Sequence, residues 1–109
     1  MAVKIHSTLW KVCFVSAKDN MLRRSDGSLS VGVTDNRTKT IYISDELQGR
    51  FLEKVVTHEL VHAFSFSYGI YIPVDVEEQI ADFLATYGRD VFNVADKLLQ
   101  EITGVYKAV

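Results

Sequence analysis

The segment His58-Glu59-Leu60-Val61-His62 places two imidazoles four residues apart, with a carboxylate directly after the first. Around it, apolar residues recur at three- and four-residue steps, which predicts an α-helix over residues 45–68. Residues four apart on a helix lie one turn above each other, so both imidazoles can reach a single point in space. Glu59 is the next residue after His58, so its carboxylate is expected to lie near the same point.

This spacing is the HExxH pattern of zinc hydrolases. Zinc prefers a tetrahedral ligand set, so His58 and His62 are predicted to bind Zn²⁺ while Glu59 faces the fourth coordination position. The alternative is an amphipathic helix whose two histidines are neutral and hydrogen-bonded in a core. Gly49 lies in the first turns of the predicted helix, so its start is left open between a cap at Asp45 and Gly49 itself.

The 44 residues before the helix are expected to form a small, mostly antiparallel sheet. Residues 3–5 and 8–16 carry the alternating, β-branched and aromatic types of strands. Residues 30–34 and 40–44 flank a polar stretch of five and predict a β-hairpin. The polar segment 18–30 contains Asp26-Gly27, a turn signal, and is expected to be a loop with one helical turn near residues 20–23.

After the helix, Tyr68-Gly69 is a stop signal and Pro73 prevents continuation. Asp75 is a predicted N-cap, and apolar periodicity over residues 75–103 predicts either one further helix or two that meet at Gly88. The chain is therefore expected to be one α+β domain spanning residues 1–109. Its parts are a β-rich region (1–44), the motif helix (45–68) and the C-terminal helices (75–103).

Zinc held by two histidines needs a third protein ligand if one position is to stay open for water. Glu78 and Asp82 are four residues apart on the predicted second helix, and Glu78 is the expected ligand. Glu77 is the fallback. Asp75-x-x-Glu78 is also a capping box, in which the Glu78 carboxylate would return to the N-cap amide, so both interpretations of Glu78 stay open.

The string His58-Glu-Leu-Val-His62, a spacer of fifteen residues, then Glu78-Gln-Ile-Ala-Asp82 resembles the HExxH…ExxxD signature of gluzincin metallopeptidases. The resemblance implies that His58, His62 and Glu78 bind Zn²⁺ and that Glu59 activates water. It also implies that Asp82 orients the first histidine from behind, fixing its tautomer.

The short length, the β-rich first half and the Glu-x-x-Ala-Asp string are similar to ImmA/IrrE-like peptidases and minigluzincins, which have a zincin-like fold. Related reading frames are common in phages and mobile elements. Asp82-Phe83-Leu84-Ala85 only loosely matches the family's Asn or Asp followed by Phe-Ala, which leaves the subfamily open.

The resemblance implies zinc-dependent hydrolysis of a protein or peptide substrate, such as a specific regulatory protein. Residues 40–44, immediately before the helix, are the expected edge strand for pairing with that substrate. Three tyrosines are candidates for stabilising the oxyanion, with no basis for choosing among them: Tyr68, Tyr71 and Tyr87.

Two alternatives to an active peptidase remain. The first is a non-catalytic binding module that zinc stabilises, although such a site has no use for the water-activating Glu59. The second is a latent peptidase whose segment 96–109 covers the cleft.

Composition excludes some other classes of function. Twelve basic and fourteen acidic residues give a formal charge of −2, and Arg23-Arg24 is the one basic cluster, so nucleic-acid binding is not expected. Cys13 is the single cysteine, which rules out an intramolecular disulfide. No apolar segment has the length of a membrane span or of a signal-peptide core, so a soluble, cytoplasmic protein is expected. The sequence does not indicate the oligomeric state.

Overall fold

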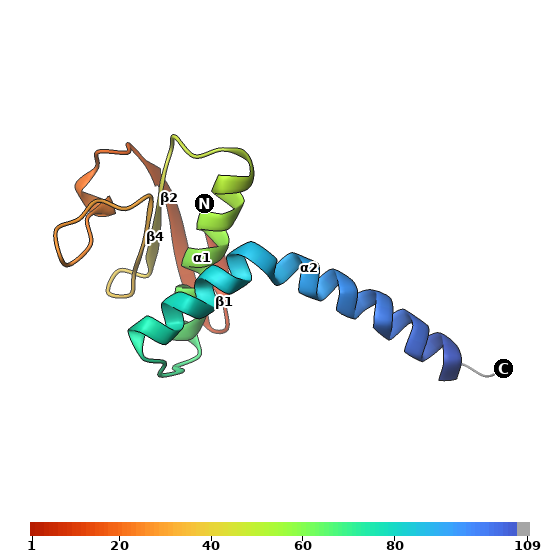
Figure 1. Cartoon of the computed structure of the whole chain (residues 1–109). Helices are drawn as coiled ribbons and strands as arrows, with labels where there is room; N and C mark the ends of the chain where they lie inside the picture. The colour runs from red at the N-terminus through yellow and green to blue at the C-terminus, as the bar shows by residue number, and fades with distance from the viewer. Residues whose placement is uncertain (107–109) are drawn as a thin grey trace.

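The computed structural model describes residues 1–106, and the side chains as far as residue 104. The fold is α+β, as the sequence predicts. A four-stranded sheet in the first half packs against α1 (Gly49–Ser67), and α2 (Val74–Tyr106) crosses α1 and then extends away from the rest of the molecule (Figure 1).

The sheet has the order β1-β2-β4-β3, and all four strands lie where the sequence predicts them. Its members are β1 (Ala2–Ile5), β2 (Thr8–Val15), β3 (Gly32–Asp35) and β4 (Thr40–Ser44). The β1–β2 and β3–β4 pairs are antiparallel, whereas β2 and β4 are parallel. The loop that makes the parallel crossover contains the predicted helical turn, η1 (Asn20–Leu22).

The expectation that β4 is an edge strand is wrong. Its residues pair on one side with β2, as in Val12↔Ile41, and on the other with β3, as in Val33↔Tyr42. Ile41 and Ile43 are both buried, which suits a strand covered by neighbours rather than one open to a ligand. The edge strands of the sheet are β1 and β3, and β3 is the one that lies beside Glu59 of α1.

The core lies between the sheet and α1. Trp10 on β2 is fully buried, and its indole Nε1 donates a hydrogen bond of 2.6 Å to Ser67 Oγ at the end of α1. The remaining members are buried aliphatic side chains of the sheet and α1: Ile5, Ile41, Ile43, Val55 and Ala63. This packing fixes the position of α1 against the sheet.

The helix boundaries settle three open points. Helix α1 begins at Gly49 rather than at an Asp45 cap, and Gly69, with φ of 63°, follows its end. Helix α2 begins at Val74, so Asp75 lies inside the first turn instead of capping it. The reason is that the Pro73 carbonyl already accepts the Glu77 amide at 2.9 Å, which starts the helix one residue early. The helix then continues through Gly88 without a break.

Gly32 allows β3 to lie close to α1. A Cβ atom at this position would come within 2.8 Å of Val55 Cγ1 and 3.0 Å of Glu59 Cγ. We therefore expect Gly32→Ala to lower the free energy of unfolding by about 1–3 kcal/mol, because a packed core accommodates an added methyl group only by straining its neighbours. Chemical denaturation measures this effect. Gly27→Ala is not a suitable control, because Gly27 has a positive φ. Ser25→Ala, at an exposed position of the same loop, is the control.

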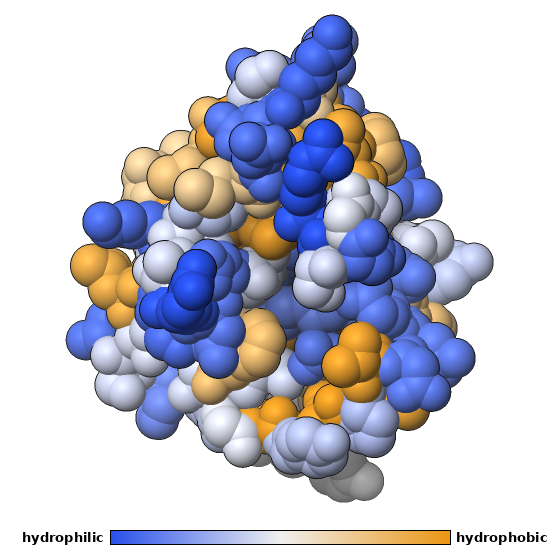
Figure 2. All heavy atoms as spheres, turned by 90° about the vertical axis from the view of Figure 1, so that its left-hand side faces the viewer, coloured by the Kyte–Doolittle hydropathy of each residue, from blue (hydrophilic) through white to orange (hydrophobic). Residues whose placement is uncertain are grey.

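Within residues 1–106, no helix combines the length and the apolar character that crossing a bilayer requires. The face that carries the loops beside the sheet is mostly hydrophilic, with apolar side chains in small groups (Figure 2).

Candidate metal centre

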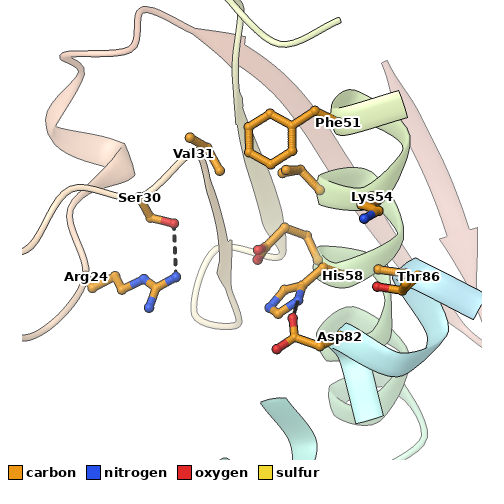
Figure 3. Close-up of a pocket in the computed structure, with 11 residues that line it drawn as sticks. Arg24, Ser30, Val31, Phe51, Lys54, His58, Asp82 and Thr86 are labelled. Atoms are coloured by element: carbon orange, nitrogen blue, oxygen red, sulfur yellow. Dashed lines mark hydrogen bonds and ion pairs between the residues drawn. The ribbon is translucent and has the colours of Figure 1, made fainter. Parts of the chain in front are cut away.

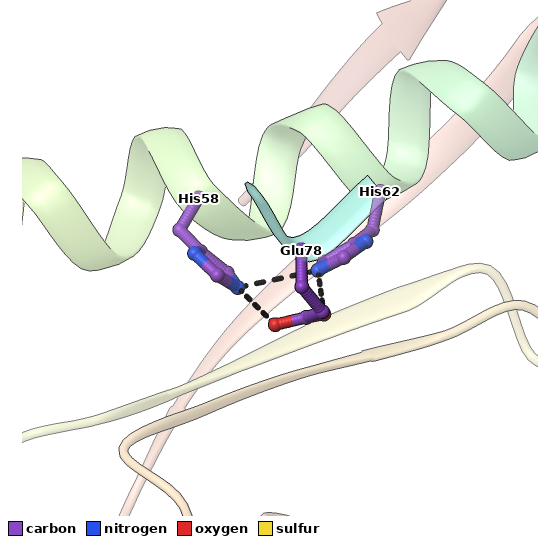
Figure 4. Close-up of side chains that lie close together, drawn as sticks. All are labelled: His58, His62 and Glu78. Atoms are coloured by element: carbon purple, nitrogen blue, oxygen red, sulfur yellow. Dashed lines mark hydrogen bonds and ion pairs between the residues drawn. The ribbon is translucent and has the colours of Figure 1, made fainter. Parts of the chain in front are cut away.

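Three side chains from two helices converge on one point (Figure 4). His58 and His62 project from successive turns of α1, and Glu78 reaches them from the first part of α2. The two Nε2 atoms lie 3.2 Å apart. Glu78 Oε2 is 3.3 Å from His58 Nε2, and its Oε1 is 2.8 Å from His62 Nε2. This group of three residues could hold a metal ion.

The spacing of the donor atoms fits a tetrahedral ion. Ligands at about 2.0–2.1 Å from a tetrahedral centre are separated from one another by roughly 3.3 Å. The measured separations of 3.2, 3.3 and 2.8 Å fall near that edge length. Small adjustments of the Glu78 side chain, which is 41% exposed, would bring the third edge to the same value.

In each of the two imidazole rings, the nitrogen that points away from the centre, Nδ1, contacts a carboxylate. His58 Nδ1 lies 2.9 Å from Asp82 Oδ1, and His62 Nδ1 lies 2.8 Å from Glu77 Oε2. A neutral imidazole has one N–H, and a carboxylate at Nδ1 favours the tautomer in which that N–H points to it. The lone pairs of both Nε2 atoms then face the Glu78 carboxylate. All the atoms that meet at this point are electron-pair donors, and such a set attracts a cation.

The structure thus brings together His58, His62, Glu78 and Asp82 as the sequence predicts. Glu78 does not act as the N3 residue of a capping box, because its carboxylate contacts both imidazoles. Glu77 is not a fallback ligand, since it faces the opposite nitrogen of His62. The sequence did not predict that Glu77 orients the His62 ring. The structural sign of this role is that Glu77, next to Glu78, is buried.

We expect Glu77→Gln to weaken metal binding at the candidate centre by about 10- to 100-fold, because a neutral amide oxygen is a weaker acceptor than a carboxylate and lowers the basicity of the His62 ring. Asp82→Asn should have an effect of similar size through His58. Competition with a chromogenic chelator measures both affinities. The control is Asp75→Asn, an exposed acid of the same helix turn; equal affinities in all three variants would contradict the orienting roles.

Glu59 follows His58 on α1, beside the candidate metal ligands, and is only 6% exposed. The hydroxyl of Thr34, on β3, donates to Glu59 Oε1 at 2.8 Å and to the main-chain oxygen of the same residue at 3.0 Å. This contact joins the edge strand to the motif helix and holds the carboxylate in one orientation. Sequence patterns gave no sign of it, because Thr34 also fits an ordinary strand position.

Two cavities meet at His58 and Glu59. The smaller, of about 330 Å³, lies between the β3 side and α1, and the larger, of about 710 Å³, extends along β3 toward the start of α2. Arg24 lines both cavities and lies across from His58 (Figure 3), and it donates to Ser30 Oγ at 3.2 Å. The two cavities share Arg24, His58 and Glu59, and the larger one is also lined by His62 and Glu78, so the candidate metal centre opens into it.

Asp35, the last residue of β3, lines the larger cavity. Burial opposes its ionisation, but hydrogen bonds from Arg37 and Thr38 outweigh that cost and hold the pKa of Asp35 below its usual value. The Arg37 amide donates at 2.9 Å. Asp35 is thus a fixed negative charge in this wall at neutral pH.

Neither the candidate oxyanion tyrosines nor the described part of the candidate cover of a latent enzyme lies at the cleft. None of Tyr68, Tyr71 and Tyr87 lines either cavity, and Tyr71 is 93% exposed. Tyr68 instead stacks on His6, with ring centroids 4.6 Å apart. In the alternative of a latent enzyme, the segment 96–109 covers the cleft. Its described part, 96–106, belongs to the projecting end of α2 and does not cover the groove (Figure 1). Residues 107–109 lie outside the described chain.

Comparison of the chain with protein-family models, with curated proteins and with solved structures finds no match. The chemistry of the site must therefore be argued from its own residues. The fold and the site define a small α+β domain with a candidate metal centre in the wall of a cavity.

Proposed function

We propose that this protein is a zinc-dependent peptidase. The observation that carries the proposal is the convergence of two imidazoles and one carboxylate next to a further, buried carboxylate, Glu59, inside an open groove. A purely structural zinc site closes its ligand set with four protein groups. Here three groups converge, and the resemblance to gluzincins assigns the same residues the same roles.

When bound, zinc would supply Lewis acidity that polarises the scissile carbonyl and lowers the pKa of the attacking water toward about 7. Glu59 accepts the proton of that water and delivers it to the leaving amine. Thr34 keeps the Glu59 carboxylate turned toward the groove. Asp82 and Glu77 keep the two rings in the tautomer that presents Nε2.

The free edge of β3 is the proposed binding site for the substrate backbone, in place of β4. The Ser44 amide donates to the Val31 carbonyl at 2.9 Å, and hydrogen-bonded pairs alternate along an antiparallel ladder. Val33 therefore directs its main-chain groups to β4, whereas Gly32 and Thr34 direct theirs outward. Ser30 Oγ already contacts the Gly32 amide and carbonyl, so the groups of Thr34 are the ones offered to a substrate. Since Gly32 and Thr34 also line the larger cavity, an extended peptide paired there would pass beside His58 and Glu59.

The proposed activity is tested with a proteome-derived peptide library. Zinc-loaded protein should cleave a subset of peptides at internal bonds, a chelator should stop cleavage, and added zinc should restore it. Protein that binds zinc stoichiometrically but cleaves nothing, in peptides or in intact cytoplasmic proteins, would contradict the proposal and favour a binding module.

Thr34→Val should lower kcat by about 10- to 100-fold with little change in KM or zinc affinity, because the general base loses the contact that orients it. Thr34→Ser keeps a hydroxyl and should restore most of kcat. Steady-state kinetics on a cleaved peptide separate these terms. If valine and serine variants have equal activity, the hydroxyl has no positioning role.

A further inference from the structure

Arg24 is a cation without an acidic partner. It lines both cavities and lies across from His58 (Figure 3). A guanidinium carries five N–H donors, and in Arg24 one of them donates to Ser30 Oγ. Among the side chains that the structure describes, every ion pair involves His58 or His62, so no carboxylate pairs with Arg24. Its remaining donors are available to a ligand.

The loop that carries Arg24 is fixed by hydrogen bonds. The Arg24 amide donates to the Ser28 carbonyl at 2.8 Å, and the Ser30 amide donates to the Leu22 carbonyl at 2.8 Å. Leu22 is fully buried, which anchors the loop to the body of the protein. The acid of this loop, Asp26, is bound by the Ser28 amide and hydroxyl. The main chain therefore presents the guanidinium from one position, which lowers the entropy that ligand binding costs.

The smaller cavity, of about 330 Å³, suits a side chain with an apolar stem. Three of its elements contribute apolar residues to the lining: Val31 before β3, Phe51 and Val55 on α1, and Ala85 on α2. Phe51 is 55% exposed. A methylene chain placed against this ring would remove apolar surface of both groups from water.

The charges of this cavity that lack a partner are positive. Lys54, half-buried on α1, is a second cation in the lining, and no described carboxylate forms an ion pair with it. Glu59 and Asp82 line the cavity as well, but each carboxylate has a partner. Glu59 accepts the hydroxyl of Thr34, and Asp82 contacts His58 Nδ1.

We infer that the smaller cavity is a subsite for a carboxylate of the substrate, which Arg24 binds beside the scissile bond. The inference rests on the proposed function and names the substrate class: peptides with an acidic side chain or a free carboxyl end at that position. An arginine can bind a carboxylate through two parallel hydrogen bonds. Because both cavities share His58 and Glu59, a residue that enters the smaller one would flank the cleaved bond.

The acids of the cavity favour a carboxylate over a phosphate. Glu59 and Asp82 lie in the same lining as the two cations, Arg24 and Lys54. A phosphate carries close to two negative charges at neutral pH, so these acids would repel it more strongly than they repel a carboxylate. A single negative charge at the end of an apolar stem is the chemistry that this lining fits.

Binding of three peptide pools tests the inference. Every peptide is a hexamer with a neutral fluorophore at its amino end and neutral residues at all positions but one. The first pool has Glu at that position and an amidated carboxyl end. The second has Gln and an amidated end, and the third has Gln and a free carboxyl end. Fluorescence anisotropy measures the affinities of zinc-supplemented Glu59→Gln protein, which is expected to bind peptides without cleaving them.

The Glu pool should bind about 10- to 100-fold more tightly than the amidated Gln pool, the range of hydrogen bonds to a charged group. Adding Arg24→Gln should make the two affinities nearly equal. Arg24→Lys keeps the charge but loses the planar fork, and should retain part of the preference. The matched control is Arg37→Gln, which removes the same charge from an exposed arginine that lines neither cavity. Arg24 is exposed, so its variants are expected to fold.

The third pool identifies the source of the carboxylate. Tight binding of this pool would assign the subsite to the end of a chain, and weak binding, with tight binding of the Glu pool, would assign it to an acidic side chain. The inference is overturned if neither carboxylate-bearing pool binds more tightly than the neutral pool. A preference that persists in Arg24→Gln would overturn it as well.

Cleavage of the same pools by zinc-loaded wild-type protein separates this inference from the proposed function. A carboxylate preference in binding without cleavage of any pool would contradict the peptidase and leave the subsite in place. Cleavage of all three pools with equal kcat/KM would contradict the subsite and leave the peptidase in place.

Discussion

Glu59→Gln is expected to lower the rate of peptide hydrolysis by about 10²- to 10⁴-fold, the range that general acid–base groups supply. Glutamine has the same shape, and its amide oxygen can still accept the Thr34 hydroxyl, so the fold and the groove should be retained. It cannot take up a proton from water. Zinc should remain bound at one ion per chain, because Glu59 is not among the three converging ligands.

Parallel measurements of kcat and of zinc content separate the two properties. Glu53→Gln is the matched control, since Glu53 is an exposed glutamate on the same helix and should leave both properties unchanged. Wild-type cleavage by Glu59→Gln would exclude this residue as the general base. Loss of zinc from the same variant would show that Glu59 is a ligand instead.

His58→Ala is expected to remove zinc binding and hydrolysis together. The substitution takes away one of three ligands and leaves the Asp82 carboxylate without its imidazole. The loss of zinc affinity should exceed the roughly 100-fold upper range for removing an orienting group behind a ligand. Isothermal titration with zinc measures the affinity, and a cleavage assay on the same samples measures the activity.

The third histidine of the chain is the control for this experiment. His6 is exposed, stacks on Tyr68, and lies outside the group of converging ligands, so His6→Ala should bind zinc as wild type does. An unchanged zinc affinity in His58→Ala would contradict the assigned metal centre, whatever its effect on activity.

The part of the site that could be predicted from the sequence is the part that local geometry dictates. The i,i+4 spacing fixes His58 and His62 on one face of α1 before any tertiary contact is known. The same spacing brings Asp82 into line with Glu78 once the two helices pack. Glu77 could not be assigned this way, because its contact with His62 Nδ1 depends on the crossing of α1 and α2, which no single-helix pattern contains.

The sheet shows the same limit. Each strand follows from its own residues, but the parallel pairing of β2 with β4 joins segments far apart in the chain and changed which strand has a free edge. The buried Ile41 and Ile43 are consistent with a central strand, although a short apolar run also fits an edge strand over a core. The contact between Thr34 and Glu59 depends on that strand order and was equally out of reach.

The most direct test of the metal centre is anomalous diffraction from crystals of the zinc-loaded protein, measured at the zinc edge. We predict one strong peak about 2.0–2.1 Å from the Nε2 atoms of His58 and His62 and about 2.0–2.2 Å from a Glu78 oxygen. A well-ordered protein with no peak among these three side chains, under conditions of zinc saturation, would contradict the account.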